Sequence, residues 1–370
     1  MNIGCVKEIK KHEYRVGLIP THAATYISHG HIVNIEKGAG LGSGFEDQEY
    51  IDAGAKICES ASSVWEQSDM IIKVKEPLES EYQYFREDLI VYTYLHLAAD
   101  KPLTEALIKH KVSGVAYETI TDEFNGLPLL KPMSEVAGRL SIQEGAKFLE
   151  KPFGGRGVLL AGVPGVPKGK VVIIGGGTVG ANAAKIAIGM GADVTILDKS
   201  IRRLEQLEHL FGNSIQTLYS TEAIIASQLE TADLVIGAVL IPGASAPKVI
   251  KRWMLKGMRP GSVIVDVAVD QGGCTETTKV TYHDDPVYVI EDVVHYCVAN
   301  MPGATPRTST QALTNATLEM GLLLANQGLE AAIKTNRHLC EGVNTFKGHC
   351  VHEHVAHALD LDYVSIKTLL

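Results

Sequence analysis

A glycine-rich stretch between Lys170 and Asp198 constrains the fold of this chain more than any other part of the sequence. It begins with the apolar run Val171–Ile174, whose β-branched residues are typical of a buried parallel strand. Three glycines follow, then an expected alanine-rich helix over Ala181–Met190 and a second expected strand over Asp193–Leu197. This order of strand, turn, helix, strand and acid predicts a doubly wound sheet that binds a dinucleotide.

The three glycines, Gly175, Gly177 and Gly180, have GxGxxG spacing. Gly175 permits a sharp turn, Gly177 allows the backbone to approach a pyrophosphate, and Gly180 allows the helix to pack closely on the strand. The N-terminus of the helix offers unpaired N–H groups and the positive end of its dipole. Three glycines alone would also suit a merely flexible turn, but the flanking strands and the acid favour dinucleotide binding.

The acid that ends the second strand indicates which cofactor is bound. A carboxylate at Asp198 can accept hydrogen bonds from both hydroxyls of a ribose and repels a 2′-phosphate, which favours NAD over NADP. Lys199, Arg202 and Arg203 follow closely and weaken this preference, because cations there attract a phosphate.

Composition excludes several classes of protein. The net charge is −9 and the basic residues form no long cluster, which argues against a nucleic acid or an anionic membrane as a partner. The six cysteines include no CxxC pair, so we expect reduced thiols in a cytoplasmic protein. The N-terminus enters a strand pattern at once and the apolar runs are short, so we expect neither a signal peptide nor a membrane span.

The chain is too long for one ordinary core, since it has 370 residues, and two domains are expected. We predict an α/β fold with two doubly wound parallel-sheet domains hinged about a cleft, of which the nucleotide-binding one is Rossmann-type. Residues 131–304 would bind NAD, and residues 1–130 with 305–370 would form the substrate domain. The second crossing is expected because residues 1–130 need a further helix, which Thr310–Asn326 can supply.

Short apolar runs mark the strands of both domains. A long helix is expected over Ser134–Glu150, with Ser134 as its N-cap. The expected strands of the first domain are Ile3–Val6, Ile32–Ile35, Met70–Val74, Leu89–Tyr94 and Gly114–Tyr117, and those that follow the fingerprint are Ser214–Leu218, Leu234–Leu240, Ser262–Val267 and Val287–Ile290. The loops expected to line the nicotinamide end are Ile241–Gly243, Ala268–Gly273 and Cys297–Pro302.

Four ionisable residues follow different strands of the first domain: Arg15, Lys75, His96 and Glu118. Because ligands of parallel sheets gather beyond the carboxyl ends of the strands, these residues form a candidate site. Asp270, in a loop of the nucleotide domain, is expected to face the same cleft. Together they suggest hydride transfer to or from a small anionic substrate.

Each residue suits a role in this chemistry. The guanidinium of Arg15 can hold a carboxylate through two parallel hydrogen bonds, and Lys75 can add a positive charge. His96 can transfer a proton near neutral pH, and Asp270 can stabilise a protonated group or receive an amine. The alternatives are a surface ion pair for Arg15, the end of a strand for Lys75, a buried core histidine for His96 and a turn cap for Asp270. No metal is required.

Eight segments of the chain resemble L-alanine dehydrogenases, in the family that includes transhydrogenase alpha subunits. They are KEIKKHEYRVGLIP near the start, KVKEP at Lys73–Pro77, YLHLA at Tyr94–Ala98, KPMSEVAGRLS at Lys131–Ser141, the fingerprint itself, LIPGASAPK at Leu240–Lys248, VDVAVDQGGC at Val265–Cys274 and NMPGATPRTST at Asn300–Thr310. The similarity runs from end to end.

The resemblance implies reversible, NAD-dependent oxidative deamination of L-alanine to pyruvate and ammonia, usually by a homohexamer. By the same resemblance Arg15 and Lys75 bind substrate, and His96 and Asp270 serve in catalysis. The family's cofactor contacts would fall on Ser134, Gly175, Gly177, Thr178, Val179, Gly180, Asp198, Arg203, Ser220, Val239, Leu240, Val267, Asp270, Asn300 and Met301.

One segment departs from the pattern of the family. His349, Cys350, His352, His354 and His357 crowd the C-terminal tail, although their spacing matches no defined zinc site, and a solvated polar surface is the simpler expectation. Three other functions remain open: a saccharopine-type dehydrogenase, a transhydrogenase-like nucleotide-binding subunit, and an inactive NAD sensor.

Overall fold

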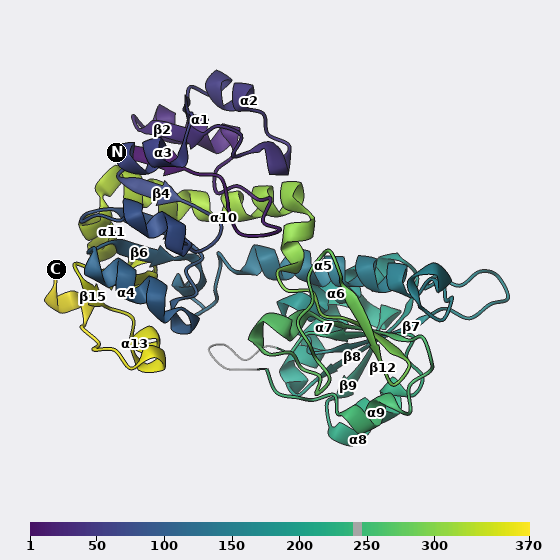
Figure 1. The fold of residues 1–370 in the computed structure, drawn as a ribbon. Coiled ribbons are helices and arrows are strands. Elements are labelled where there is room, and N and C mark those ends of the chain that lie inside the picture. Colours follow the sequence, from purple (N-terminus) through teal and green to yellow (C-terminus); the bar gives the residue numbers. More distant parts are fainter. Residues whose placement is uncertain (240–245) are drawn as a thin grey trace. The chain divides into compact units, whose positions relative to one another are not determined.

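The computed structural model describes residues 1–239 and 246–370 and divides into two compact units (Figure 1). Unit 1 contains Met1–Met133 and Thr305–Leu370, and unit 2 contains Ser134–Ala304. The two termini therefore belong to the same unit. In the part of the chain that the structure describes, no helix combines the length and the apolar character needed to cross a membrane.

The sheet of unit 1 has eight strands in the order β15-β14-β6-β5-β4-β1-β2-β3. The first six strands along the chain are all parallel and have the 3-2-1-4-5-6 order of a Rossmann sheet. Their bounds are β1 Asn2–Cys5, β2 Ile32–Glu36, β3 Lys56–Cys58, β4 Met70–Ile72, β5 Ile90–Thr93 and β6 Ser113–Ala116. The strand order reverses between β1 and β4, which makes this point the expected ligand-binding edge.

Two strands that the sequence did not predict come from the C-terminal tail. β14 (Val343–Phe346) pairs antiparallel with β6, and β15 (His349–Cys350) pairs antiparallel with β14. The predicted parallel doubly wound sheet is therefore confirmed, and these two strands add an antiparallel edge to it. The helices of unit 1 are α1 Pro20–Ser28, α2 Asp47–Asp52, α3 Ala61–Gln67, α4 Lys101–Lys109, α10 Pro306–Gln327, α11 Leu329–Thr335, α12 Arg337–Glu341 and α13 Glu353–Leu359.

Helix α10 stabilises the loop that follows β1. Its Thr310 hydroxyl accepts a hydrogen bond from the backbone N–H of Val16 at 3.2 Å and lies 2.8 Å from the hydroxyl of Ser43. The helix also packs tightly against α1, because a Cβ at Gly321 would lie 2.1 Å from the Tyr26 hydroxyl oxygen. These contacts fix the backbone beside Arg15.

The sheet of unit 2 has seven strands in the order β12-β13-β11-β10-β7-β8-β9. Without β12, the order is again 3-2-1-4-5-6, as in a Rossmann domain. The predicted strand over Val287–Ile290 is present as β12, but it is an antiparallel edge strand that pairs with β13. The bounds are β7 Lys170–Ile174, β8 Asp193–Asp198, β9 Gln216–Tyr219, β10 Leu234–Gly237, β11 Val263–Asp266, β12 Val287–Ile290 and β13 Val293–Tyr296.

The helices of unit 2 cover both faces of this sheet. Helix α5 begins at Lys131, so the prediction that Ser134 is its N-cap was wrong and Ser134 lies inside the helix. Pro132 does not break the helix, because it lies in the first turn. Backbone N–H groups there have no acceptor within the helix, so the N–H that proline lacks is not missed. The helices are α5 Lys131–Phe148, α6 Thr178–Gly189, α7 Ile201–Phe211, α8 Glu222–Leu229 and α9 Arg252–Leu255.

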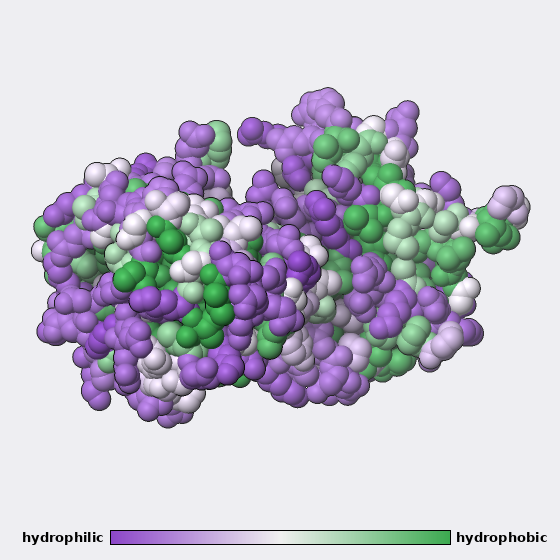
Figure 2. All heavy atoms as spheres, turned by 90° about the horizontal axis from the view of Figure 1, so that it is seen from above, coloured by the Kyte–Doolittle hydropathy of each residue, from purple (hydrophilic) through white to green (hydrophobic). Residues whose placement is uncertain are grey.

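Apolar side chains from the strands form the core on each face of the sheets. In unit 2, alternate residues of β7 face opposite sides: Val171 and Ile173 belong to one cluster, and Val172 and Ile174 to the other. Both faces are covered, which explains the continuous apolar run in the sequence. On the surface seen in Figure 2, hydrophilic residues surround smaller hydrophobic patches.

Candidate functional site

The glycine turn of unit 2 has a different physical reason for each glycine. Gly175 has a φ of +102°, and a Cβ there would lie 2.5 Å from the carbonyl oxygen of Ala238. A Cβ at Gly180 would lie 1.9 Å from the carbonyl oxygen of Gly175, so helix and strand meet at backbone distance. A Cβ at Gly177 would meet no described atom within 4 Å. The fold therefore needs glycine at positions 175 and 180, whereas Gly177 keeps a space open.

The open space lies at the N-terminus of α6. Gly177 is the N-cap residue, and no side chain caps the helix there. The first-turn amides, including those of Thr178 and Val179, therefore have no side-chain acceptor at the cap. A pyrophosphate fits this arrangement, because helix N-terminal N–H groups and the helix dipole both favour an anion.

Asp198 is held beside the same turn. Its Oδ2 accepts a hydrogen bond from the backbone N–H of Gly176 at 2.7 Å, and its Oδ1 accepts one from Ser200 at 2.8 Å. Arg203 donates from Nε to the carbonyl oxygen of Gly176 at 2.6 Å, and the backbone N–H of Ser220 donates to the carbonyl oxygen of Asp198 at 3.0 Å. The structure therefore brings Asp198, Arg203 and Ser220 together.

Helix α5 reaches the turn by close packing. A Cβ at Gly138 would lie 2.3 Å from the carbonyl oxygen of Val179, so α5 and α6 touch through their backbones. Ser134 is one helical turn before Gly138 and is half-buried. Val239 follows β10, next to the Gly175 turn, whereas Leu240 and the loop Ile241–Gly243 lie outside the described residues.

The remaining cofactor candidates follow β11 and β13. Asp270 is exposed on a 3-10 helix, Val267–Gln271, and its Oδ2 accepts a hydrogen bond from the backbone N–H of Asn300 at 3.4 Å. Met301, next to Asn300, is buried. Two loops distant in sequence thus meet at Asp270.

A buried carboxylate that sequence reasoning missed supports this loop. Asp266, fully buried at the end of β11, accepts hydrogen bonds from the backbone N–H groups of Ala268 at 3.1 Å, Cys274 at 2.9 Å and Thr275 at 3.3 Å. These bonds fix both ends of the loop that carries Asp270. Asp266 therefore caps the turn, a role considered for Asp270 from the sequence. Its position at the carboxyl end of an apolar strand was the available signal.

In unit 1, Arg15 lies in the loop after β1 and is almost fully buried. Its Nε donates to Glu13 Oε1 at 2.6 Å and its Nη2 to Glu13 Oε2 at 2.5 Å. Burial opposes the charged form of Arg15, but the hydrogen bonds and charge of Glu13 outweigh it and raise the pKa of the guanidinium. Arg15 is not a surface ion-pair residue, which was the alternative considered from the sequence.

Lys75 follows β4, on the other side of the switch point in strand order. The carboxylate of Glu8 accepts hydrogen bonds from the backbone N–H groups of Val74 at 2.6 Å and Lys75 at 3.2 Å. Glu8 also pairs with the fully buried ammonium of Lys73 at 3.2 Å, and Lys73 pairs with Glu81 at 3.0 Å. This buried triad of Glu8, Lys73 and Glu81 fixes the backbone from which Lys75 projects.

His96 follows β5 and adopts a left-handed backbone conformation, with a φ of +51°. Its side chain is 45% exposed, which rules out the buried core histidine considered from the sequence. The imidazole stacks on Tyr94 with ring centroids 5.9 Å apart and planes 15° apart. Glu118, after β6, accepts hydrogen bonds from the backbone N–H groups of Leu95 at 3.1 Å and His96 at 2.6 Å.

Partial burial lowers the pKa of His96, Glu118 opposes that effect, and the positive charge of Lys75 adds to it. Tyr94 stands next to both His96 and Arg15. Its ring stacks on the imidazole of His96, and the guanidinium of Arg15 is close enough to oppose the rise that burial causes in the pKa of the Tyr94 hydroxyl. Arg15, Lys75 and His96 therefore belong to one neighbourhood at the carboxyl edge of the sheet.

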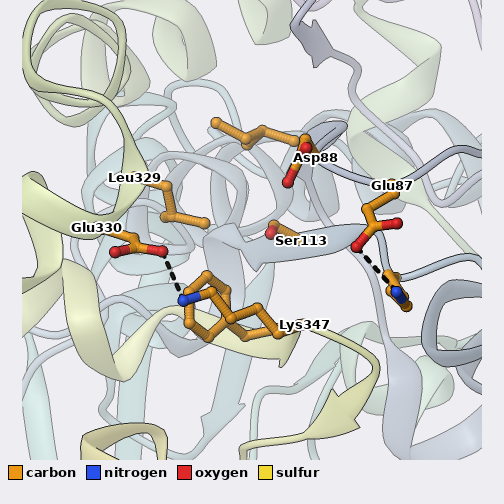
Figure 3. A pocket seen from close by; sticks show the side chains of 9 residues that line it. Glu87, Asp88, Ser113, Leu329, Glu330 and Lys347 are labelled. Carbon is orange, nitrogen blue, oxygen red and sulfur yellow. Dashed lines mark hydrogen bonds and ion pairs between the residues drawn. The ribbon is translucent and has the colours of Figure 1, made fainter. Parts of the chain in front are cut away.

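A cavity in unit 1 lies at the opposite end of the same strands. It has a volume of about 180 Å³ and reaches Ile90 and Ser113, the first residues of β5 and β6. Figure 3 shows Lys347 of this cavity paired with Glu330, at 2.6 Å. Lys111, which also lines the cavity, pairs with Glu87 at 2.9 Å. We do not assign catalysis to this cavity, since His96 follows the other end of β5.

The histidines of the C-terminal tail have their own neighbours. The rings of His352 and His354 lie 5.8 Å apart, and His338 Nδ1 lies 2.9 Å from the hydroxyl oxygen of Thr121. Within residues 1–239 and 246–370, no group of three or more His, Cys, Asp or Glu side chains is arranged to hold a metal ion.

Two family models match nearly the whole chain. "Alanine dehydrogenase/PNT, N-terminal domain" matches residues 4–137, and "Alanine dehydrogenase/PNT, C-terminal domain" matches residues 141–353. The chain is 57% identical to alanine dehydrogenase of Staphylococcus haemolyticus, over 100% of this chain and 99% of that protein. It is 56% identical to alanine dehydrogenase 2 of Staphylococcus aureus, over the full length of both.

Solved structures give the same result. An L-alanine dehydrogenase superposes with a TM-score of 0.95 at 52% identity, over 97% of this chain and 99% of the other. A transhydrogenase from Sinorhizobium meliloti superposes with a TM-score of 0.82 at 25% identity, over 95% of this chain and 99% of the other. The similarity to alanine dehydrogenases thus extends across both units.

Proposed function

Because the chain belongs to the alanine dehydrogenase/PNT family, we propose that it is an alanine dehydrogenase that reversibly deaminates L-alanine to pyruvate and ammonia with NAD. The observation that carries this proposal is that Arg15, Lys75 and His96 follow the carboxyl ends of the neighbouring strands β1, β4 and β5 of unit 1. A nucleotide-binding subunit without an amino-acid substrate would have no need of these three residues.

The cofactor is a nicotinamide dinucleotide, and NAD is the form proposed. The space at Gly177, the uncapped start of α6 and the carboxylate of Asp198 support this assignment. In the proposal the pyrophosphate lies at the glycine turn, and Asp198 accepts hydrogen bonds from the adenosine ribose. The remaining contacts proposed are those given above by family resemblance, from Ser134 to Met301.

The substrate carboxylate is proposed to bind Arg15 and Lys75. Glu13 already balances the charge of Arg15, so Lys75 supplies the additional positive charge that an anionic substrate requires. The two loops are fixed by Glu13 and by Glu8, so little order has to be gained on binding.

His96 and Asp270 are proposed to carry the proton transfers. A bound nicotinamide would supply the acceptor for the hydride that leaves the Cα of alanine. His96 then takes a proton from the water that attacks the resulting imine, for which its lowered pKa keeps the imidazole neutral near pH 7. His96 passes that proton to the nitrogen of the carbinolamine, which leaves as ammonia while the hydroxyl proton goes to His96, and Asp270 stabilises the positive charge on that nitrogen. In the reverse direction His96 moves the same protons the opposite way.

Absorbance of NADH tests the proposed function directly. We expect NADH formation with L-alanine and NADH consumption with pyruvate plus ammonium, and weaker activity with other amino acids and oxo acids. Activity confined to saccharopine, or hydride exchange between nicotinamide cofactors without any amino acid, would replace this proposal by one of the alternatives.

Replacing Arg15 with lysine tests the substrate site. Lysine keeps the charge but loses the two-pronged geometry, both toward a carboxylate and toward Glu13. We expect KM for L-alanine to rise by about tenfold to a hundredfold, while the affinity for NAD is unchanged. Steady-state kinetics and NAD titration by calorimetry measure the two effects. A raised KM for NAD with an unchanged KM for alanine would contradict the assignment.

Replacing Asp198 with alanine tests the choice of cofactor. The change removes the carboxylate that repels a 2′-phosphate and leaves Arg203 beside the turn. We expect the ratio of kcat/KM for NAD to that for NADP to fall by about tenfold or more. Replacing Asp193, an exposed acid at the other end of β8, is the matched control and should leave the ratio unchanged.

The proposal extends to the assembly and the location of the protein. A homohexamer in the cytoplasm accords with the family resemblance and with six cysteines that form no disulfide in the structure's described residues. Light scattering of the purified protein gives the mass of the assembly. A monomer at micromolar concentration would contradict the proposed oligomer.

A further inference from the structure

Carboxylates that accept backbone N–H bonds lie behind several of the proposed site residues. Glu8 accepts from Lys75, Glu118 from His96, and Asp266 from the loop of Asp270. Of these, Glu118 also faces the ionisable side chain that it positions, since its Oε1 lies 4.0 Å from His96 Nδ1. Glu118 can therefore act on both the geometry and the charge of His96.

The geometric effect of Glu118 concerns the left-handed backbone conformation of His96. A non-glycine residue in the left-handed region is uncommon and carries a cost that its surroundings must offset. At His96 the offset comes from one carboxylate, which accepts from His96 N–H at 2.6 Å and from Leu95 N–H through both of its oxygens, at 3.1 and 3.3 Å. These bonds end β5 and turn the chain so that the imidazole projects beyond the strand.

The electrostatic effect depends on every charge near the imidazole. Glu118 comes from the 3-10 turn Tyr117–Thr119, Lys75 and Glu76 from the loop after β4, and Lys10 from the loop after β1. Lys10 and Glu76 form an ion pair with each other, so their effects largely cancel. Glu118 and Lys75 remain as opposed charges, one favouring the imidazolium and the other disfavouring it.

We propose that Glu118 is a positioning residue for the oxidative deamination. It holds His96 in its left-handed turn and keeps a negative charge beside the imidazole. This inference rests on the proposed function, because it assumes that His96 transfers protons. The negative charge favours the imidazolium, which is the state that His96 reaches when it has taken a proton from the attacking water.

Two substitutions separate the two effects. Glu118→Gln keeps an oxygen that can accept the backbone bonds but removes the charge, whereas Glu118→Ala removes both. For Glu118→Gln we expect the pH midpoint of His96 to move to lower pH, because a charge that favours the imidazolium is gone. We expect kcat to fall by about tenfold for Glu118→Gln and by about a hundredfold for Glu118→Ala.

The midpoint is measured without turnover, by an NMR titration of protein labelled at the histidine Cε1 position. The signal of His96 among 14 histidines is assigned from its loss in His96→Asn. Glu123→Gln, an exposed acid on the same connection, is the matched control and should change neither the midpoint nor kcat. Thermal unfolding of each variant checks that the fold is retained.

The outcomes distinguish the two proposals. A lower midpoint in Glu118→Gln, with the pH profile of pyruvate amination displaced in the same direction, supports the inference. An unchanged or higher midpoint overturns it, even if kcat falls. A wild-type protein that does not act on alanine overturns the proposed function instead, whereas the titration still reports whether Glu118 controls His96. If Glu118→Ala does not fold, Glu118→Gln alone decides.

Discussion

Replacing His96 with alanine is expected to reduce turnover of L-alanine by about 10²–10⁴-fold, the range for loss of a general acid–base group. The imidazole is half exposed at the carboxyl edge of the sheet and lies beside Lys75, as a group that meets substrate requires. Its removal leaves no other group on that turn with a pKa near neutrality. Steady-state kinetics in both directions measure the loss, which should fall on kcat more than on KM.

The same variant has to retain its other properties for this result to be informative. NAD affinity should be unchanged, because the residues proposed to hold the dinucleotide belong to unit 2, whereas His96 belongs to unit 1. His349→Ala, at an exposed position of β15, is the control and should keep wild-type turnover. If His96→Ala also keeps wild-type turnover, His96 is structural and the proposed proton transfers are wrong.

The parts of the fold that follow from local patterns could be predicted from the sequence. Strand β7 is the predicted run Val171–Ile174 extended by one residue, Lys170. The glycine spacing identified a turn whose close contacts the structure shows. Arg15, Lys75 and His96 were expected after separate parallel strands, and they lie after β1, β4 and β5. Their roles remain predictions.

The parts that depend on contacts distant in sequence could not be predicted. The segment Val343–Phe346 is short and carries two polar residues, and it becomes a strand only because the edge of β6 is available for antiparallel pairing. The start of α5 was placed three residues too late, because a serine is a common N-cap and Pro132 reads equally well as a breaker. Local patterns do not reveal which alternative the tertiary packing selects.

The supporting carboxylates were missed for the same reason. Glu8 and Glu81 look like solvated charges in the sequence, since both lie in polar segments. In the structure they converge on Lys73, which is one residue beyond β4 and has no exposed surface. Only the rarity of a buried lysine, which needs partners, could have pointed to them.

Replacing Lys73 with methionine is therefore expected to have the largest effect on stability. The variant leaves the carboxylates of Glu8 and Glu81 buried without their cation, and breaking a buried ion pair in this way costs about 3–5 kcal/mol. Lys37→Met is the matched control, because its partner Glu59 is 79% exposed and a surface pair of this kind contributes little to stability.

Urea unfolding in a Trp253→Phe background isolates this effect. The chain has two tryptophans, and the remaining Trp65 is fully buried in unit 1, so its fluorescence reports the unit that contains Lys73. Burial already raises the pKa of Glu8, and the variant removes the charge of Lys73 that opposes this rise. A raised carboxyl pKa lowers stability as pH rises, so the deficit of the variant grows from pH 5 to pH 8. A deficit no larger than that of Lys37→Met, or one that shrinks with rising pH, would show that the triad does not hold the Lys75 loop through a buried charge.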